Sequence, residues 1–524
     1  MDTFDYVIVG SGSAGCVLAG RLSEDPDVSV CLLEAGGSDR DLNVLIPAAF
    51  SKLFRTDRDW AYLSDPEPGL IGRRLFMPRG KMIGGSSSMN AMLYVRGNRA
   101  DYDGWAKDGA PGWSYEQVLP YFRRSEDFSR GEDEFHGVGG PLHVIDHRSR
   151  TAITERMVQA AVETGLPFND DYNGAHQEGV AYLQVNQRHG RRWSAADAWL
   201  HPAMSRKNLT VRTQSQVTRV VVEQGRATGV SIQTKDGTQT VRARCEVILS
   251  AGAIGSPQLL MLSGIGPADH LHDLGIDVVV DNPNVGDHYQ DHPFYLLNWE
   301  TTATGTLAEA ERPLQLLQFV TRGRGLLTST VAEGTAFLAT REGLPAPDLQ
   351  LHFGAAYFHN HGFDTHDKPA FAIAPTLVAP HSRGRIRLRS ADPFEPPSVV
   401  GNHLTEAADI EAMRAGVELA REIARQKSLA PLIVRELHPG DRVSGPDAIE
   451  RDLRRDTELI YHPTSTARMG APGQSVVDPE LRVLGIDALR VVDASVFPTI
   501  PRGNTNAAVY MVAERAADLI RAAR

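Results

Sequence analysis

A glycine motif near the N-terminus, enclosed by a strand, a helix and a second strand, constrains the fold more than any other part of the chain. Gly10–Gly15 (GSGSAG) follows an apolar, β-branched run at Phe4–Val9 and precedes a helical pattern of small and apolar residues. A second apolar run, Val28–Leu33, ends directly before Glu34. This order of elements predicts a parallel βαβ unit with its glycine loop at the carboxyl end of the first strand.

Each residue of this unit has a physical role in binding a dinucleotide. Gly10 allows the tight turn, Gly12 lets the backbone approach a pyrophosphate, and Gly15 lets the helix pack on the strand. The helix N-terminus offers unpaired N–H groups to the phosphates, and Glu34 can accept from ribose hydroxyls. The motif alone leaves FAD and NAD open. The predicted cofactor contacts here are Gly10, Gly12, Ser13, Ala14, Gly15, Glu34 and Ala35.

The length and charge of the chain narrow its class. A chain of 524 residues exceeds one hydrophobic core, so two large domains are expected. A net charge of −11 argues against a general nucleic-acid binder and against wide attachment to an anionic membrane. No apolar run reaches the roughly 18 residues of a membrane span. The absence of a leader pattern and the odd count of three cysteines favour a cytoplasmic protein.

The pattern along the chain predicts a discontinuous α/β architecture. Residues 209–250 alternate like an antiparallel meander that returns to the parallel sheet. Residues 371–380 and 384–390 are expected to pair as strands, residues 407–426 to form an amphipathic helix, and residues 504–522 a final helix. We predict a Rossmann-like dinucleotide domain and a second domain with a mostly antiparallel sheet flanked by helices. The first comprises 1–150, 205–294 and 456–524; the second, which would bind substrate, comprises 151–204 and 295–455.

Two further glycine-bearing loops have open roles when taken alone. Residues 80–90 (GKMIGGSSSMN) form either a second cofactor-contacting loop or a turn that caps a helix. Residues 252–266 (GAIGSPQLLMLSGIG) contain a loop, a helix of about two turns and a glycine exit, as an ordinary structural helix would.

Together and in this order, these stretches resemble the glucose–methanol–choline (GMC) oxidoreductase family of flavoproteins. NVGDHYQDHPF at 284–294, LRVVDASVFP at 489–498 and GNTNAAVYMVAERAADLI at 503–520 are also similar to family sequence. The resemblance covers the whole chain and implies FAD as the cofactor. By that resemblance Glu34 would hold the adenosine ribose, and the Val217 backbone would meet adenine. The other implied FAD contacts are Gly84, Gly85, Ser88, Asn90, Ala91, Asp493, Asn504 and Thr505.

The resemblance also implies a catalytic pair. His462 lies in YHPTSTARMG and Asn504 in PRGNTNA. A histidine can take an alcohol proton near neutral pH, and an asparagine can bond the same oxygen without competing for that proton. On spacing alone, His462 is one of 18 histidines. The family places a histidine at this position and a histidine or asparagine at the second, which implies oxidation of a primary alcohol to an aldehyde, as in choline-dehydrogenase-like members.

One departure and one alternative bear on this expectation. Some members carry a histidine before the asparagine of the first motif and bond it to the flavin; Met89 stands there, so we predict non-covalent FAD. Some relatives on the same fold are lyases or light-driven fatty-acid decarboxylases, and this non-redox function stays the alternative. The electron acceptor is oxygen or another molecule, and the chain is a monomer or homodimer. No aromatic cage with a carboxylate for choline can be placed.

Other residues that draw attention have plainer explanations. His359, His361 and His366 lie close together, but they are expected to form a polar loop at the substrate entrance, and no metal site is predicted. His292 is expected to cap a loop between the domains. Tyr461, directly before the predicted base, is a candidate for shaping the pocket.

Overall fold

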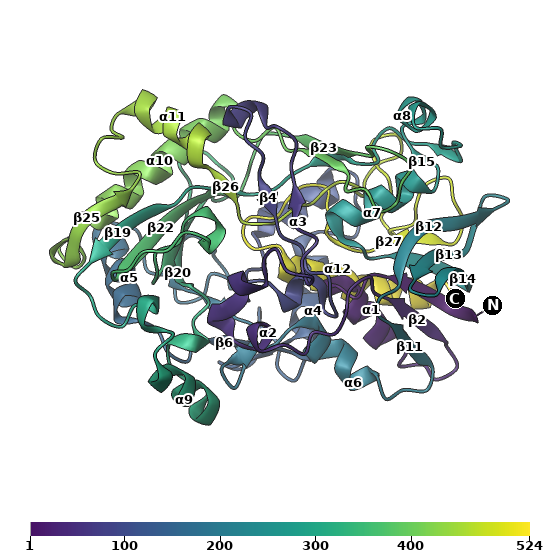
Figure 1. The fold of residues 1–524 in the computed structure, drawn as a ribbon, viewed down its shortest axis with the longest axis horizontal. Coiled ribbons are helices and arrows are strands. Elements are labelled where there is room, and N and C mark those ends of the chain that lie inside the picture. The colour runs from purple at the N-terminus through teal and green to yellow at the C-terminus, as the bar shows by residue number, and fades with distance from the viewer. Residues whose placement is uncertain (1) are drawn as a thin grey trace.

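The computed structural model describes residues 2–524 and contains two large sheets at opposite ends of the molecule (Figure 1). The helix α12 (Asn506–Ala522) begins near the middle of the molecule and runs toward the end that holds the first sheet, where both termini lie. This mixed α/β arrangement agrees with the predicted fold class. The division into two domains, with the bounds given above, stays a prediction.

The first sheet is built on the predicted βαβ unit. The strand β1 (Asp2–Val9) pairs in parallel with β2 (Val30–Leu33) and β14 (Gly237–Leu249). Tyr6–Val9 and the whole of β2 are buried, as expected for strands covered on both faces. The helix α1 (Ser13–Leu22) packs against α12, and Arg21 bonds Glu514 across that contact. The sheet is completed by β11 (Leu209–Arg212), β12 (Gln216–Glu223), β13 (Arg226–Thr234) and β27 (Leu489–Val491).

The second sheet is antiparallel throughout and is covered on one side by the helices α5 (Ala152–Glu163) and α10 (Ala407–Ala424). The predicted inward residues of α10, such as Met413 and Val417, are buried. The strands of this sheet are β25 (Ile433–His438), β19 (Leu297–Thr301), β22 (Ala370–Leu377), β21 (Leu349–Gly354), β20 (Ala332–Leu338), β7 (Gly179–Tyr182), β18 (Pro293–Phe294) and β26 (Glu458–Leu459).

Two details of the predicted strand pairing are wrong. The strand β11 does not join the antiparallel meander; it pairs in parallel with β2 at the sheet edge. The strand β23 (Gly384–Arg387) does not pair with β22; it lies between β17 (Asp287–Tyr289) and β24 (Ser398–Val400). The backbone N–H groups of His381 and Ser382 bond the carboxylate of Asp409, which turns the chain away before β23 begins.

Shorter elements connect these layers and carry several residues of the site. The helices are α2 (Leu42–Leu45), η1 (Pro47–Leu53), η3 (Gly85–Ser88), α3 (Arg99–Lys107), α4 (Tyr115–Ser125), η4 (Ala196–Leu200), α6 (His201–Ala203), α7 (Gly252–Leu262), α8 (Ala268–Asp273), α9 (Pro313–Arg322) and α11 (Pro446–Asp456). Short strands include β3 (Tyr62–Leu63), β4 (Phe76–Met77), β5 (Glu126–Phe128), β6 (Leu142–Asp146), β8 (Gln184–Val185), β9 (Gln187–Arg188), β10 (Arg191–Arg192), β15 (Ile265–Gly266) and β16 (Val280–Asp281).

Candidate functional site

One cavity of about 390 Å³ runs from the glycine loop of the first sheet to the second sheet. Most of the predicted site residues line it: Gly10, Gly12, Ser13, Ala14, Glu34, Ala35, Gly85, Asn90, Ala91, Val217, His462, Asp493, Asn504 and Thr505. We call the part beside β1, β2 and α7 the nucleotide end, after the dinucleotide predicted from the sequence, and the part beside the second sheet the alcohol-side end, after the predicted substrate. His462 and Asn504 contact each other within this single cavity.

The three glycines of the first motif hold the nucleotide end open. Gly10 has φ of +94°, and a Cβ there would lie 2.5 Å from the carbonyl oxygen of Ser250. A Cβ on Gly15 would lie 1.9 Å from the carbonyl oxygen of Gly10, so this residue must be glycine for α1 to pack. A Cβ on Gly12 would meet no protein atom within 4 Å and would point into space that a ligand can use. Gly10 and Gly15 are therefore required for close backbone packing, whereas Gly12 faces space that is open to a ligand.

Three helix N-termini meet the cavity wall. The first residues of α1, α7 and α12 all line it, at Ser13, Gly252 and Asn506 respectively. Ser13 Oγ bonds Asn506 Oδ1 at 2.6 Å, which ties the start of α1 to the start of α12. Each N-terminus carries a partial positive charge and N–H groups that have no partner within the helix, and at α7 the first of these, Gly252 N–H, bonds Asp493. The nucleotide end is therefore suited to an anionic group such as a pyrophosphate.

Two buried carboxylates stiffen the same region. Glu34 accepts from Ser11 N at 2.9 Å, Ser11 Oγ at 2.7 Å and Gly36 N at 2.8 Å. Asp493 accepts from Gly252 N at 2.9 Å and Ser256 Oγ at 2.5 Å. Burial raises the pKa of both carboxyl groups, and these donors oppose the shift. Both side chains also line the cavity, so each fixes a loop that faces the ligand.

The second glycine loop lies directly on the first. A Cβ on Gly85 would lie 2.7 Å from Gly12 Cα, so the two loops are in backbone contact. Gly84, Ser88 and Gly15 are not among the residues that line the cavity, and their cofactor contacts stay predictions. Ser88 Oγ donates to the Ile83 carbonyl oxygen at 2.9 Å, and Gly84 is needed because a Cβ would lie 2.0 Å from that hydroxyl. These residues shape the loop behind the cavity wall.

The predicted catalytic pair is in contact. His462 Nε2 lies 3.4 Å from Asn504 Nδ2, and both residues line the cavity. Asn504 Oδ1 is buried and has no hydrogen-bond partner. His462 follows β26, and Asn504 precedes α12, so the pair joins the second sheet to the central helix.

Behind His462 lies a support that the sequence did not reveal. His462 Nδ1 is 3.0 Å from His292 Nδ1. Asp291 Oδ1 accepts from the backbone N–H of His462 at 2.7 Å and from that of His292 at 2.8 Å. His292 was expected only to cap a loop; it contacts the candidate base instead. The motif at 284–294 marks this segment, but no spacing rule relates it to a residue 170 positions later.

Burial controls the protonation of this group. Burial lowers the pKa of His462 well below its ordinary value, and the positive charge of Arg79 acts in the same direction. It also lowers the pKa of His292 to about 3 and raises that of Asp291 to about 6. Both imidazoles are therefore uncharged at neutral pH, and His462 can accept a proton.

The alcohol-side end of the cavity is aromatic and aliphatic. Phe50 stacks on Phe358 with ring centroids 6.3 Å apart, and Phe54 meets Tyr461 edge to face at 5.7 Å. All four line the cavity, so Tyr461 shapes the pocket. Its hydroxyl is 2.7 Å from His361 Nδ1. No local sequence pattern indicates these aromatic contacts, because η1 and the segment around Phe358 are far apart along the chain.

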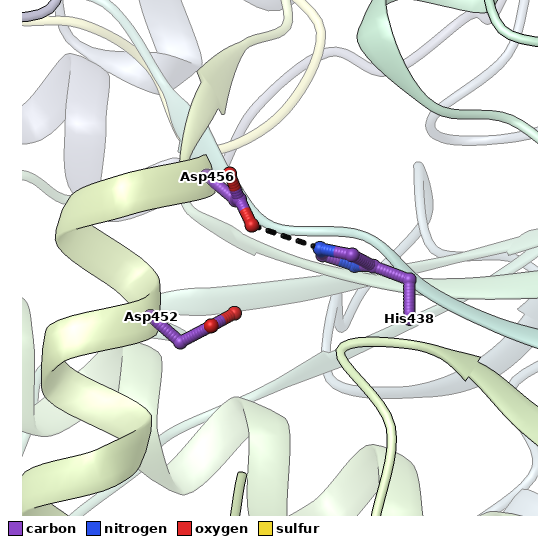
Figure 2. Close-up of side chains that lie close together, drawn as sticks. All are labelled: His438, Asp452 and Asp456. Atoms are coloured by element: carbon purple, nitrogen blue, oxygen red, sulfur yellow. Dashed lines mark hydrogen bonds and ion pairs between the residues drawn. The ribbon is translucent and has the colours of Figure 1, made fainter. Parts of the chain in front are cut away.

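The other clustered side chains bond to protein partners. His359 contacts Asp364, and His361 contacts Tyr461, so the predicted polar loop is held by separate pairs. A second group comprises His438, Asp452 and Asp456 (Figure 2), and none of the three lines the cavity. His438 bonds Asp456 at 3.0 Å and the Leu296 carbonyl at 2.6 Å, while Arg455 pairs with both carboxylates. This group is an ion-pair network between β25 and α11.

Within residues 2–524, no helix is both long enough and apolar enough to cross a membrane.

Comparison with known proteins identifies the family. GMC oxidoreductase sequence matches residues 4–294 and 380–513. The alcohol dehydrogenase [acceptor] of Pseudomonas putida is 42% identical, over 99% of this chain and 95% of its own length. Human mitochondrial choline dehydrogenase is also 42% identical, over 99% of this chain and 90% of its own. An uncharacterised GMC-type oxidoreductase of Mycobacterium tuberculosis is 46% identical, over 99% and 100%.

Solved structures have the same fold as this chain. Pyridoxine 4-oxidase from "Mesorbium loti" superposes with a TM-score of 0.90 at 32% identity, covering 98% of each chain. Formate oxidase superposes with a TM-score of 0.94 at 28% identity, covering 100% of this chain and 99% of the other. With both matched segments, the full-length relatives and the shared fold in place, the chain belongs to the GMC oxidoreductase family.

Proposed function

We propose that the protein oxidises a primary alcohol to an aldehyde with FAD as the hydride acceptor and His462 as the base. The observation that carries the proposal is the contact of an uncharged His462 with Asn504 on the wall of a cavity that also meets three helix N-termini. Relatives named choline dehydrogenase and alcohol dehydrogenase are consistent with this reaction class.

The residues of the nucleotide end fit FAD. Gly12 leaves room beside the backbone, and the N-termini of α1, α7 and α12 favour the pyrophosphate. Ser250 Oγ and Asn504 Oδ1 are buried without hydrogen-bond partners, and both residues line the cavity. Such unpaired polar atoms indicate a polar ligand. When bound, FAD would supply the acceptor for the hydride that leaves the carbinol carbon.

The protein's own part is to bind the hydroxyl group and take its proton. Both His462 contacts form hydrogen bonds when Asn504 Nδ2 donates to His462 Nε2 and His462 donates its Nδ1 proton to His292. The lone pair that His462 can offer to a ligand is then on Nε2, on the side of Asn504. A hydroxyl between the two side chains would donate to Nε2 and accept from Nδ2. His462 would take the hydroxyl proton as the carbon loses hydride, which leaves the aldehyde.

Steady-state turnover tests the reaction. We expect aldehyde to accumulate when the flavin-loaded protein is incubated with a primary alcohol and a dye that accepts electrons. Omission of either alcohol or protein is the control. Loss of alcohol without dye reduction would refute an oxidation and favour a non-redox enzyme on the same fold.

The attachment of FAD is tested separately. Met89 lines the cavity where some relatives carry a flavin-linking histidine, and a thioether is not a nucleophile of that kind. We expect acid precipitation to release all yellow colour into the supernatant. A yellow pellet would show a covalent bond and contradict the proposal.

A further inference from the structure

The alcohol-side end of the cavity contains a continuous apolar surface. Six pocket-lining residues pack together, which we call the apolar wall: Phe294, Leu296, Phe358, Ala372, Ala374 and Ile460. Phe294 lies in β18 and Ala372 and Ala374 in β22; Leu296 and Ile460 lie directly beside β19 and β26, and Phe358 lies in the segment after β21. The wall therefore lies on and beside the second sheet.

The apolar wall adjoins the candidate base. Ile460 precedes His462 by two residues, and Phe294 follows His292, which contacts His462. The strand β18 pairs with β26, so Phe294 lies opposite Glu458 in the register that leads to His462. A substrate whose hydroxyl reaches His462 must lay the rest of its body near this wall.

No negative charge on the cavity lining accompanies the wall. Of the residues that line the cavity in the described chain, the carboxylates are Glu34, Asp493 and Glu395. The first two hold the loops of the nucleotide end. The backbone carbonyl of Glu395 accepts a hydrogen bond from Gln258 of α7, so Glu395 also lies at the nucleotide end.

A positive charge lies on the lining of the alcohol-side end, whereas the carboxylates that interact with it, Asp291 and Asp59, do not line the cavity. Arg79 lines the cavity and donates from Nη2 to the carbonyl oxygen of Tyr461 at 2.7 Å. Tyr461 directly precedes His462, and the field of Arg79 reaches His462. A cationic substrate would lose its hydration here and face Arg79 without a lining carboxylate to compensate. Aromatic faces offset only part of that cost.

We propose that the substrate is a primary alcohol that is uncharged and apolar beyond its hydroxyl group, and that quaternary ammonium alcohols such as choline are poor substrates. This inference rests on the proposed alcohol oxidation. The apolar wall would bind an alkyl chain or ring by excluding water from it, and His462 with Asn504 would bind the single hydroxyl.

A matched pair of alcohols tests the inference. Choline and 3,3-dimethylbutan-1-ol have the same shape, because a quaternary carbon in the second replaces the charged nitrogen of the first. We would mix each anaerobically with the flavin-loaded protein and measure the rate of flavin bleaching against alcohol concentration. We expect the neutral alcohol to be more efficient by at least about 100-fold, as an unpaired buried charge requires.

The outcomes separate the two proposals. Equal or faster bleaching by choline would overturn the substrate class while leaving alcohol oxidation intact. Bleaching by neither compound, nor by straight-chain or benzylic primary alcohols, would overturn the proposed function together with the substrate class. Bleaching by the neutral alcohol alone supports both.

A pair of variants tests the role of charge at the wall itself. Phe294→Glu places a carboxylate there, and Phe294→Gln is the matched neutral control of nearly the same size. At pH 8, we expect the ratio of choline to 3,3-dimethylbutan-1-ol efficiency to rise by at least about tenfold in the Glu variant relative to the Gln variant. Equal ratios in two variants that retain flavin would contradict the argument. Ala374→Asp with Ala374→Asn repeats the test at a second position.

Discussion

The two ends of the cavity are built from different parts of the polypeptide. The nucleotide end consists mainly of backbone: glycines in close contact, helix N-termini, and two carboxylates held by loop N–H groups. The alcohol-side end consists mainly of side chains, with the apolar wall, an aromatic group and one polar pair. A backbone site binds one ligand shape and tolerates little change, whereas a side-chain site can be altered residue by residue. Substitutions at the nucleotide end should therefore affect folding and FAD binding, whereas substitutions at the alcohol-side end should affect the rate of flavin reduction.

The largest effect is expected from His462→Ala. Loss of the base should lower the rate of flavin reduction by an alcohol by about 10²–10⁴-fold, with FAD still bound, because the nucleotide end is untouched. Anaerobic stopped-flow absorbance measures the rate, and the flavin-to-protein ratio is the control. An unchanged rate in the variant would remove His462 from the mechanism.

At the nucleotide end, alanine substitutions of two glycines should impair different properties, FAD binding in one case and folding in the other. Gly12→Ala has a compatible φ of −73° and room for its methyl group, so it should fold but bind FAD at least about tenfold more weakly. Gly15→Ala would place its Cβ against the Gly10 carbonyl oxygen and should impair folding itself. Circular dichroism and flavin titration distinguish the two. Full flavin content in Gly12→Ala would show that this glycine does not face the cofactor.

A smaller effect is expected from Asn504→Ala. It removes one hydrogen bond to the hydroxyl oxygen and should slow flavin reduction by about tenfold. Because the resemblance to the family allows histidine at this position, Asn504→His should recover part of the lost rate. A recovery no better than that of Asn504→Leu would show that the side chain only fills space.

The pH dependence should be the weakest response. A lowered pKa means that His462 stays unprotonated as the pH falls, until the pH approaches that lowered value. The rate of flavin reduction should therefore be constant from pH 8 down to pH 6.5, with any acid limb below that range. A limb centred at pH 7 or higher would contradict an uncharged, buried base.

The same difference explains what the sequence could predict. Gly10, Gly12 and Gly15 act through local backbone geometry, so their spacing and the flanking strand patterns were enough to place them. His462 and Asn504 needed the family resemblance, because one histidine among 18 has no local mark. The hydrogen bond from the Ser88 hydroxyl to the Ile83 carbonyl oxygen could not be predicted from the glycine and serine content of the loop. Asp291, His292 and the apolar wall depend on contacts between distant segments, which no local pattern encodes.

The central claim is that this protein passes a hydride from a primary alcohol to bound FAD. The most direct test is one anaerobic titration of the purified protein with a panel of primary alcohols that includes choline, with flavin absorbance recorded and aldehyde quantified. The account predicts bleaching of the flavin band and one aldehyde formed for each flavin reduced. A flavin band that no alcohol bleaches would contradict it and leave the lyase or light-driven decarboxylase as the better explanation of the fold.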